Sequence, residues 1–170
     1  MNILYGDKNL KYPDTLQVES GSWIVQRPLV VSSHYDNELT QVLVPLNLET
    51  DYASVPLLFQ NLFKKINEYS AVFLKHDVCY AGELFPRADC DEMLLEDLKA
   101  MGAGWIYRNT VYSAVRIGGR SVWRTHSPES KTKTRNLITQ SKEILSAKGN
   151  RFGIWLDLST GIYSNEWGMV

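Results

Sequence analysis

The chain has little cysteine, little histidine and no long hydrophobic run. Its two cysteines among 170 residues, Cys79 and Cys90, are too few for the disulfide framework of a small secreted protein. No apolar segment near the N-terminus resembles a secretion signal, and no run approaches the ~20 apolar residues that a membrane-spanning helix needs. We therefore expect a protein that is made in a reducing cytoplasm, without a disulfide and without a transmembrane segment.

An excess of either charge is also missing. The 18 Lys and Arg residues nearly balance the 19 Asp and Glu residues, and the formal net charge of -1 argues against a nucleic-acid-binding protein. The spacing of the three histidines gives no zinc signature. Hydrophobic residues make up 44% of the chain, which is enough for the core of one domain without disulfide staples.

The first part of the chain carries the signs of β-structure. β-branched runs occupy residues 23–25 and 29–31, and polar and apolar side chains alternate over residues 40–44. The composition of residues 34–37 is typical of a turn. We predict an antiparallel hairpin over about residues 23–45.

Helical patterns follow. Ser54 fits the N-cap of a first helix, and apolar residues at helical spacing predict three more helices at about 68–81, 86–101 and 105–117. Glycines terminate helices well, so Gly118-Gly119 is expected to end the last of them.

These patterns divide the chain into three parts. Residues 1–125 are predicted to form an α+β domain, in which an antiparallel hairpin or sheet packs on a bundle of about four helices. Residues 126–150 are polar and basic, which predicts a linker with a short helix at about 136–147. Residues 151–170 form either a β-like arm that docks on a partner or a hairpin that folds back onto the domain. The residues expected to bind a partner are Trp155, Ile162, Tyr163 and Trp167.

Two of the predicted helices bring a base and an acid together. His76 lies on the apolar face of one helix and Asp91 on that of the next, and the short connection favours antiparallel packing. A buried carboxylate that accepts one imidazole N–H would leave the other nitrogen free as a general base. Tyr80, one turn after His76, can donate its hydroxyl to the same carboxylate. His76, Asp91 and Tyr80 are the candidate catalytic residues, and the alternative is a structural lock within the core.

Asp77 and Asp51 are the candidate metal ligands. Asp77 points about 100° away from His76 around the helix, and Asp51 stands where the predicted sheet meets the helices. Together with backbone carbonyls, such carboxylates suit a divalent cation, calcium or zinc. The nearby Ser54 is either a nucleophile beside His76 or a helix cap alone. We favour the cap, because it explains the residue fully and no G-x-S-x-G elbow is present.

Arginine recurs every fourth residue at positions 116, 120 and 124. Such a row is typical of a solvated helix face, with anion binding as the alternative. Gly118-Gly119 lies within this row and lacks the surrounding pattern of a phosphate-binding loop.

Four ordered motifs resemble the phage-encoded family DUF 1353. The residues that carry this resemblance are Val44-Pro45, Asp51-Tyr52-Ala53-Ser54-Val55-Pro56, Lys75-His76-Asp77 with Tyr80, Arg87 with Asp91, and Val115-Arg116-Ile117-Gly118-Gly119. The departures are mild, with Tyr52 and Leu94 in place of Phe, Lys75 in place of Leu and Cys90 in place of Ala. The resemblance implies a tailed-phage or prophage protein, often encoded near tail genes, and does not itself imply an activity.

A second, local resemblance is to the active-site helices of secreted and parvoviral phospholipases A2. His76-Asp77-x-Cys79-Tyr80, followed by Cys90-Asp91 on an antiparallel helix, is similar to their motif. This resemblance implies that His76 activates water, Asp77 binds calcium and Asp91 orients His76. Their glycine-rich calcium loop has no counterpart, since Asp51-Tyr52-Ala53-Ser54 stands in its place.

These residues support two functions. The first is a virion-associated structural protein of the tail, baseplate or neck, carrying the His76–Asp91 site, made in the host cytoplasm and then bound to other virion proteins. The alternative is a cell-envelope hydrolase, phospholipase-A2-like or peptidoglycan-degrading, that acts on envelope lipid or peptidoglycan during infection or lysis. An enzyme requires that the free His76 nitrogen faces a cleft, whereas a structural lock leaves both nitrogens bonded in the core.

Overall fold

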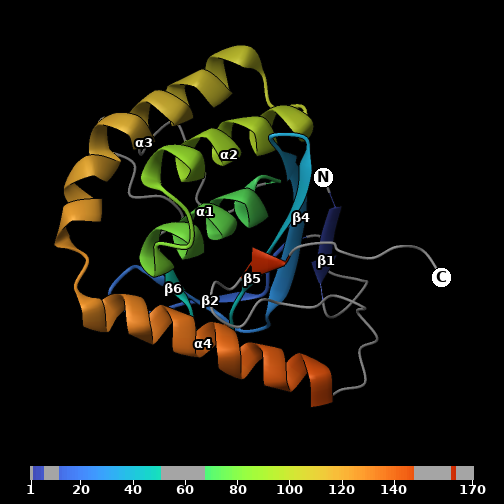
Figure 1. The fold of residues 1–170 in the computed structure, drawn as a ribbon, viewed down its shortest axis with the longest axis vertical. Coiled ribbons are helices and arrows are strands. Elements are labelled where there is room, and N and C mark those ends of the chain that lie inside the picture. The colour runs from blue at the N-terminus through green and yellow to red at the C-terminus, as the bar shows by residue number, and fades with distance from the viewer. Residues whose placement is uncertain (1, 6–11, 51–67, 148–161, 164–170) are drawn as a thin grey trace.

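The computed structural model describes residues 2–5, 12–50, 68–147 and 162–163, and this part of the chain has the expected α+β architecture. It contains two antiparallel sheets and four helices. The helices are α1 (Ser70–Gly82), α2 (Arg87–Ala100), α3 (Trp105–Thr125) and α4 (Pro128–Ala147). Figure 1 shows α1 at the centre, with α2 and α3 on one side and α4 along the opposite side.

The longest strands form the hairpin that the sequence predicts. Strand β4 (Leu29–Tyr35) pairs antiparallel with β5 (Glu38–Val44), and Asp36 and Asn37 make the loop between them. Both loop residues have a positive φ, 51° and 65°, as a type I′ turn requires. Asp and Asn adopt this conformation more readily than other non-glycine residues. The hairpin begins at Leu29 rather than at residue 23, because residues 23–25 join the other sheet.

The two sheets meet beside the helices. The larger has the order β1-β4-β5-β7, with β1 (Asn2–Tyr5) and β7 (Ile162–Tyr163) at its edges. The smaller has the order β2-β3-β6. Its strands are β2 (Thr15–Gln17), β3 (Trp23–Val25) and β6 (Glu49–Thr50). Strand β6 ends next to α1, so its last residue, Thr50, reaches a side chain of that helix.

Helix α1 ends at Gly82, one residue beyond the predicted end at about residue 81. Glu83 follows with a left-handed φ of 45° and donates its N–H to the carbonyl of Tyr80 at 3.0 Å, which caps the helix. Pro86 directly precedes α2, where its fixed φ suits a helix start. The connection is therefore short, and α1 and α2 pack antiparallel.

Helix α1 is also the most buried element of the described fold. It lies against α2, α4, β4 and β5. Of its residues, only Asp77 and Ala81 are partly exposed. Because these two residues share one side of the helix, α1 opens to solvent at a single place.

Helix α3 continues past Gly118-Gly119, so the predicted end at these glycines is wrong. A glycine inside a helix costs about 1 kcal/mol relative to alanine, which packing can offset. Here the last turns pack on α1, with the ring of Trp123 5.0 Å from that of Tyr80 in an edge-on arrangement. The helix therefore extends to Thr125.

Helix α4 begins at Pro128 rather than at residue 136, so it takes in the segment that the sequence assigned to a linker. Ser127 and Ser130 exchange hydrogen bonds between side chain and backbone at 3.1 Å and 3.2 Å, which caps the helix start. Ile138 is buried against α1, and the hydroxyl of Ser141 accepts the N–H of Leu46 at 2.8 Å. The mostly polar sequence of α4 thus forms a helix that packs on the domain, because a narrow stripe of its side chains is buried.

The first predicted helix, with Ser54 at its cap, lies outside the described residues. None of the described helices is long and apolar enough to cross a membrane.

Candidate functional site

The structure brings His76 and Asp91 together inside the protein. The Nε2 atom of His76 lies 3.1 Å from Oδ1 of Asp91. His76 is 7% exposed and Asp91 is fully buried. The helical stripes and the short connection between α1 and α2 therefore place the imidazole and the carboxylate as the sequence predicts.

Three further side chains surround the carboxylate of Asp91. Tyr80 donates its hydroxyl to Oδ1 at 2.6 Å, as predicted. Arg116 and Arg87 each direct Nη1 to Oδ2, at 3.0 Å and 3.3 Å. Arg87 also donates to the backbone carbonyl of Arg116 at 3.3 Å, which ties α2 to α3. Asp91 is thus held by groups from three helices and has little freedom to move.

The two arginines were not assigned to the site from the sequence. Arg87 precedes Asp91 by four residues, a spacing at which helical side chains meet, and this signal was available. Arg116 was placed on a solvated face, and its side chain is indeed 35% exposed, yet its guanidinium reaches the buried carboxylate.

These contacts set the charge of the pair. Burial opposes ionisation of Asp91, but hydrogen bonds from His76, Tyr80 and Arg116 hold the pKa of this carboxyl below its ordinary value. Burial also favours neutral His76, but the carboxylates of Asp77 and Asp91 outweigh it and raise the pKa of the imidazole to about 9. At neutral pH the free protein therefore holds an imidazolium between two carboxylates.

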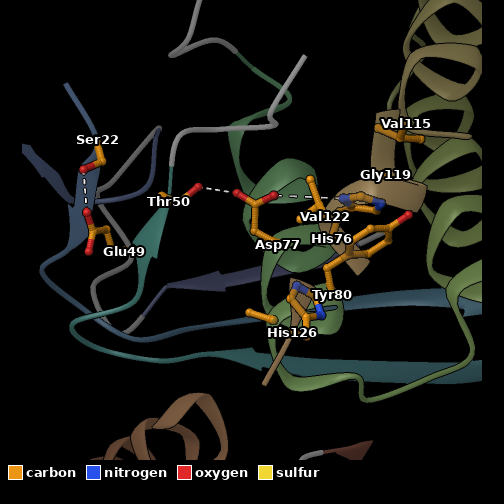
Figure 2. A pocket seen from close by; sticks show the side chains of 11 residues that line it. Ser22, Glu49, Thr50, His76, Asp77, Tyr80, Val115, Gly119, Val122 and His126 are labelled. Carbon is orange, nitrogen blue, oxygen red and sulfur yellow. Dashed lines mark hydrogen bonds and ion pairs between the residues drawn. The ribbon is translucent and has the colours of Figure 1, made fainter. Parts of the chain in front are cut away.

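A cavity of about 330 Å³ opens beside His76 (Figure 2). It lies at the opening of α1, where Asp77 and Ala81 are partly exposed. One wall is apolar and comes largely from α3. The lining residues are Ser22, Glu49, Thr50, His76, Asp77, Tyr80, Ala81, Val115, Gly119, Val122 and His126.

The two ring nitrogens of His76 have different surroundings, one in the core and one at the cavity wall. Its Nε2 is bound to Asp91 in the core, whereas its Nδ1 lies 4.0 Å from Oδ1 of Asp77, on the cavity wall. That distance is too long for a direct hydrogen bond. Nδ1 instead forms an ion pair with Asp77 at this distance, and both residues line the cavity.

Asp77 is the one predicted metal ligand within the described residues, since Asp51 lies outside them. Its Oδ2 accepts the hydroxyl of Thr50, which is the last residue of β6 (Figure 2). Among the described residues, no group of three His, Cys, Asp or Glu side chains is arranged to hold a metal ion. Calcium takes six to eight oxygen ligands, so the described residues alone do not build its site.

His126 is a cavity residue that the sequence did not reveal. It follows the last residue of α3, and its Nδ1 lies 3.4 Å from Oε1 of Glu83, without the geometry of a hydrogen bond. Its ring lies 5.7 Å from that of Trp123. No local pattern marked His126, because it reaches the cavity only through the full length of α3.

The remaining predicted residues cannot all be placed. Ser54, Trp155 and Trp167 lie outside the described residues. Ile162 and Tyr163 form β7, whose backbone pairs with Val42 and Gln41 of β5. These two positions of the predicted arm therefore fold back onto the sheet.

Two buried groups lie behind the site. Cys79 and Cys90 are free thiols, and hydrogen bonding with Cys79, together with burial, raises the pKa of Cys90. Lys75, in the turn of α1 that carries His76, donates to Asp97 at 2.7 Å and to Ser33 at 2.6 Å. All of these side chains are inaccessible from the cavity wall and act as core structure.

The fold and the site define a class: an α+β protein with a buried His–Asp pair beside a solvent-reachable cavity. A family model described as "Protein of unknown function (DUF1353)" matches residues 23–115, and the chain belongs to this family. The match includes the hairpin, α1, α2 and about half of α3. Comparisons with curated proteins and with solved structures gave no match.

Proposed function

We propose that the protein is a virion-associated protein of a tailed phage that carries a hydrolytic site for the bacterial cell envelope. The observation that supports the hydrolytic site is the two-sided environment of His76. Its Nε2 is fixed by the buried Asp91, and its Nδ1 edge borders a cavity. A structural lock would bond both nitrogens within the core.

The proposed nucleophile is water rather than a side chain. Among the described residues, three hydroxyl side chains line the cavity, and they donate to carboxylates rather than to His76: Ser22 to Glu49, Thr50 to Asp77 and Tyr80 to Asp91. In the proposed reaction, Nδ1 of His76 accepts a proton from water as the water attacks the scissile carbonyl, and the imidazolium returns this proton to the leaving oxygen or nitrogen as the ester or amide bond breaks. Asp91 keeps the proton on Nε2 and stabilises the imidazolium that forms, and Tyr80, Arg87 and Arg116 keep Asp91 ionised and in place.

The acidic residues of the cavity distinguish the two candidate substrates, phospholipid and peptidoglycan. The carboxylates of Asp77 and Glu49 would repel a lipid phosphate unless a cation lay between them. Cleavage of a phospholipid ester is therefore expected to require calcium, which is the role that the sequence gave to Asp77. Cleavage of a peptidoglycan bond carries no such requirement.

One assay tests the proposal. Fatty-acid release from phospholipid vesicles and fragment release from peptidoglycan are measured for the wild type and for His76→Ala, each with calcium and with a chelator. We expect His76→Ala to lower turnover by about 10²- to 10⁴-fold, the usual contribution of a general base. The matched control is His34→Ala, which removes an exposed histidine of β4 and should leave turnover unchanged.

The pH dependence of turnover gives a second reading. The neutral imidazole that accepts the proton becomes abundant only as the pH approaches about 9, so turnover should rise with pH up to that range. A folded wild type that cleaves neither substrate at any of these pH values would rule out the proposed hydrolase activity.

The virion part of the proposal is supported by the resemblance to phage-encoded proteins and is tested separately. Mass spectrometry should find the protein in purified particles, after its synthesis in the host cytoplasm. Its presence in infected cells but not in particles would leave only a hydrolase that acts during lysis.

A further inference from the structure

The charged residues of α3 are all basic. Its 21 residues include four arginines and no acidic residue, although the whole chain has a net charge of -1. Arg108 and Arg116 are held by the protein, through the carbonyl of Ala103 at 3.0 Å and the carboxylate of Asp91 at 3.0 Å. Arg120 and Arg124 are exposed and have no hydrogen bond or ion pair within the described part of the chain.

Large apolar side chains share the face of these two free arginines. Trp105 is 69% exposed, Ile106 76% and Ile117 78%. At 100° per residue, all three fall with Arg120 and Arg124 in one sector of about 120°. We call these five residues the outer face of α3. The buried residues of the helix lie on its opposite side, and Figure 1 shows α3 along the outside of the molecule.

We propose that the outer face of α3 binds the surface of a membrane that contains anionic phospholipid. A helix that lies in the membrane interface places apolar side chains at the boundary with the acyl chains and basic side chains among the headgroups. Tryptophan and arginine are both favoured at this level of a bilayer. From Trp105 to Arg124 the face extends about 28 Å along the helix, at 1.5 Å per residue. It is therefore long enough to lie flat on a membrane.

The chemistry of the face favours lipid over other anionic partners. Two strongly exposed isoleucines have no counterpart in the phosphate contacts that bind nucleic acid. A protein partner would need a matching hollow, whereas headgroups move to surround single side chains. On the neighbouring α2, Glu96 pairs with Lys99 and Glu92 accepts from Tyr35, and within the described part of the chain neither carboxylate makes an ion pair with Arg120 or Arg124.

This inference does not depend on the proposed hydrolysis, and its test needs no turnover. Cosedimentation is measured with vesicles of phosphatidylcholine alone and with vesicles of phosphatidylcholine and phosphatidylglycerol in equal parts. The full chain should bind the anionic vesicles only, and salt should release it. Each arginine near an anionic surface contributes about fivefold in affinity, so Arg120→Glu with Arg124→Glu should lower it by at least about 25-fold.

Matched variants separate the two contributions. Arg124→Glu is compared with Lys133→Glu, which reverses an exposed charge on α4, and Ile117→Ser with Leu16→Ser, which removes an exposed leucine of β2. Only the α3 variants should weaken binding. The proposal is overturned if the folded wild type ignores anionic vesicles or if the α3 variants bind as tightly as their controls. It is also overturned if the α3 variants abolish a dimer or binding to duplex DNA while vesicle binding is unchanged.

Discussion

The hydroxyl of Tyr80 occupies the space that a side chain at Gly119 would fill. A Cβ at Gly119 would lie 2.6 Å from this hydroxyl, which itself donates to Asp91 at 2.6 Å. Helix α3 can thus approach α1 closely because residue 119 has no side chain. The same approach lets Arg116, one turn earlier on α3, reach Asp91.

Gly119→Ala should therefore displace Tyr80 and loosen Asp91. We expect the free energy of unfolding to fall by about 1–3 kcal/mol, the usual effect of an overpacked core, although alanine is the better helix former. In a Tyr80→Phe background the new methyl no longer meets a hydroxyl, so its effect should be smaller by at least about 1 kcal/mol. Denaturant unfolding of the four proteins in this cycle measures the difference.

The control for this cycle is Gly104→Ala. A Cβ at Gly104 meets nothing within 4 Å, so this change should cost only the N-cap preference of glycine over alanine, less than about 1 kcal/mol. Equal effects of Gly119→Ala in both backgrounds would show that the Tyr80 hydroxyl does not determine the need for glycine.

The stability of the protein should fall as the pH rises from 6.5 to about 9. His76 has a folded-state pKa of about 9 against an ordinary value of 6.5. Below pH 6.5 the ring is protonated in both states, and its stabilisation of the folded state is complete. Above pH 6.5 the unfolded chain loses this proton first, so a contribution on the order of 3 kcal/mol is lost by about pH 9.

Unfolding of the wild type and of His76→Gln across this range measures that loss. The variant should give a flatter curve than the wild type, because glutamine does not titrate. A wild-type curve that matches the variant from pH 6.5 to 9 would contradict the raised pKa.

Much of the site could be predicted because it depends on local spacing. The positions of His76, Tyr80 and Asp91 on helical stripes, and the short connection before Pro86, leave few ways for α1 and α2 to pack. The loop at Asp36 is likewise a local signal. Such features need no knowledge of distant segments.

The other half of the site comes from segments far apart in the chain. Helical periodicity shows which face of α3 is apolar, but not which neighbour an edge residue such as Arg116 will reach. Thr50 and His126 border the cavity only because β6 and the end of α3 converge on α1. In α4, the buried stripe contains Thr134, Ile138 and Ser141, and one apolar residue among three was too weak a signal against a polar background.

Lys75 and Asp97 make a further prediction about the core. Both side chains are 2% exposed, and they form an ion pair at 2.7 Å. Lys75→Met alone leaves a buried carboxylate without its partner, so we expect a loss of about 3–5 kcal/mol in unfolding free energy. Lys75→Met combined with Asp97→Leu should recover most of this loss, since an apolar pair of similar volume replaces a buried ion pair well. Thermal and denaturant unfolding measure both, and a double variant as unstable as the single one would contradict this account.

The position of α4 predicts that residues 128–147 are part of the folded domain rather than a dispensable linker. Ile138 is 3% exposed, and Ile138→Ala should lower the unfolding free energy by about 2–4 kcal/mol, whereas exposed Lys133→Ala should change it by less than about 0.5 kcal/mol.

A chain that ends at residue 127 uncovers the face of α1 that α4 covers, so it should unfold at a clearly lower temperature than a chain that ends at residue 147. Calorimetry of the two truncated chains tests this directly. Equal unfolding temperatures would show that α4 contributes nothing to the core and would restore the linker interpretation.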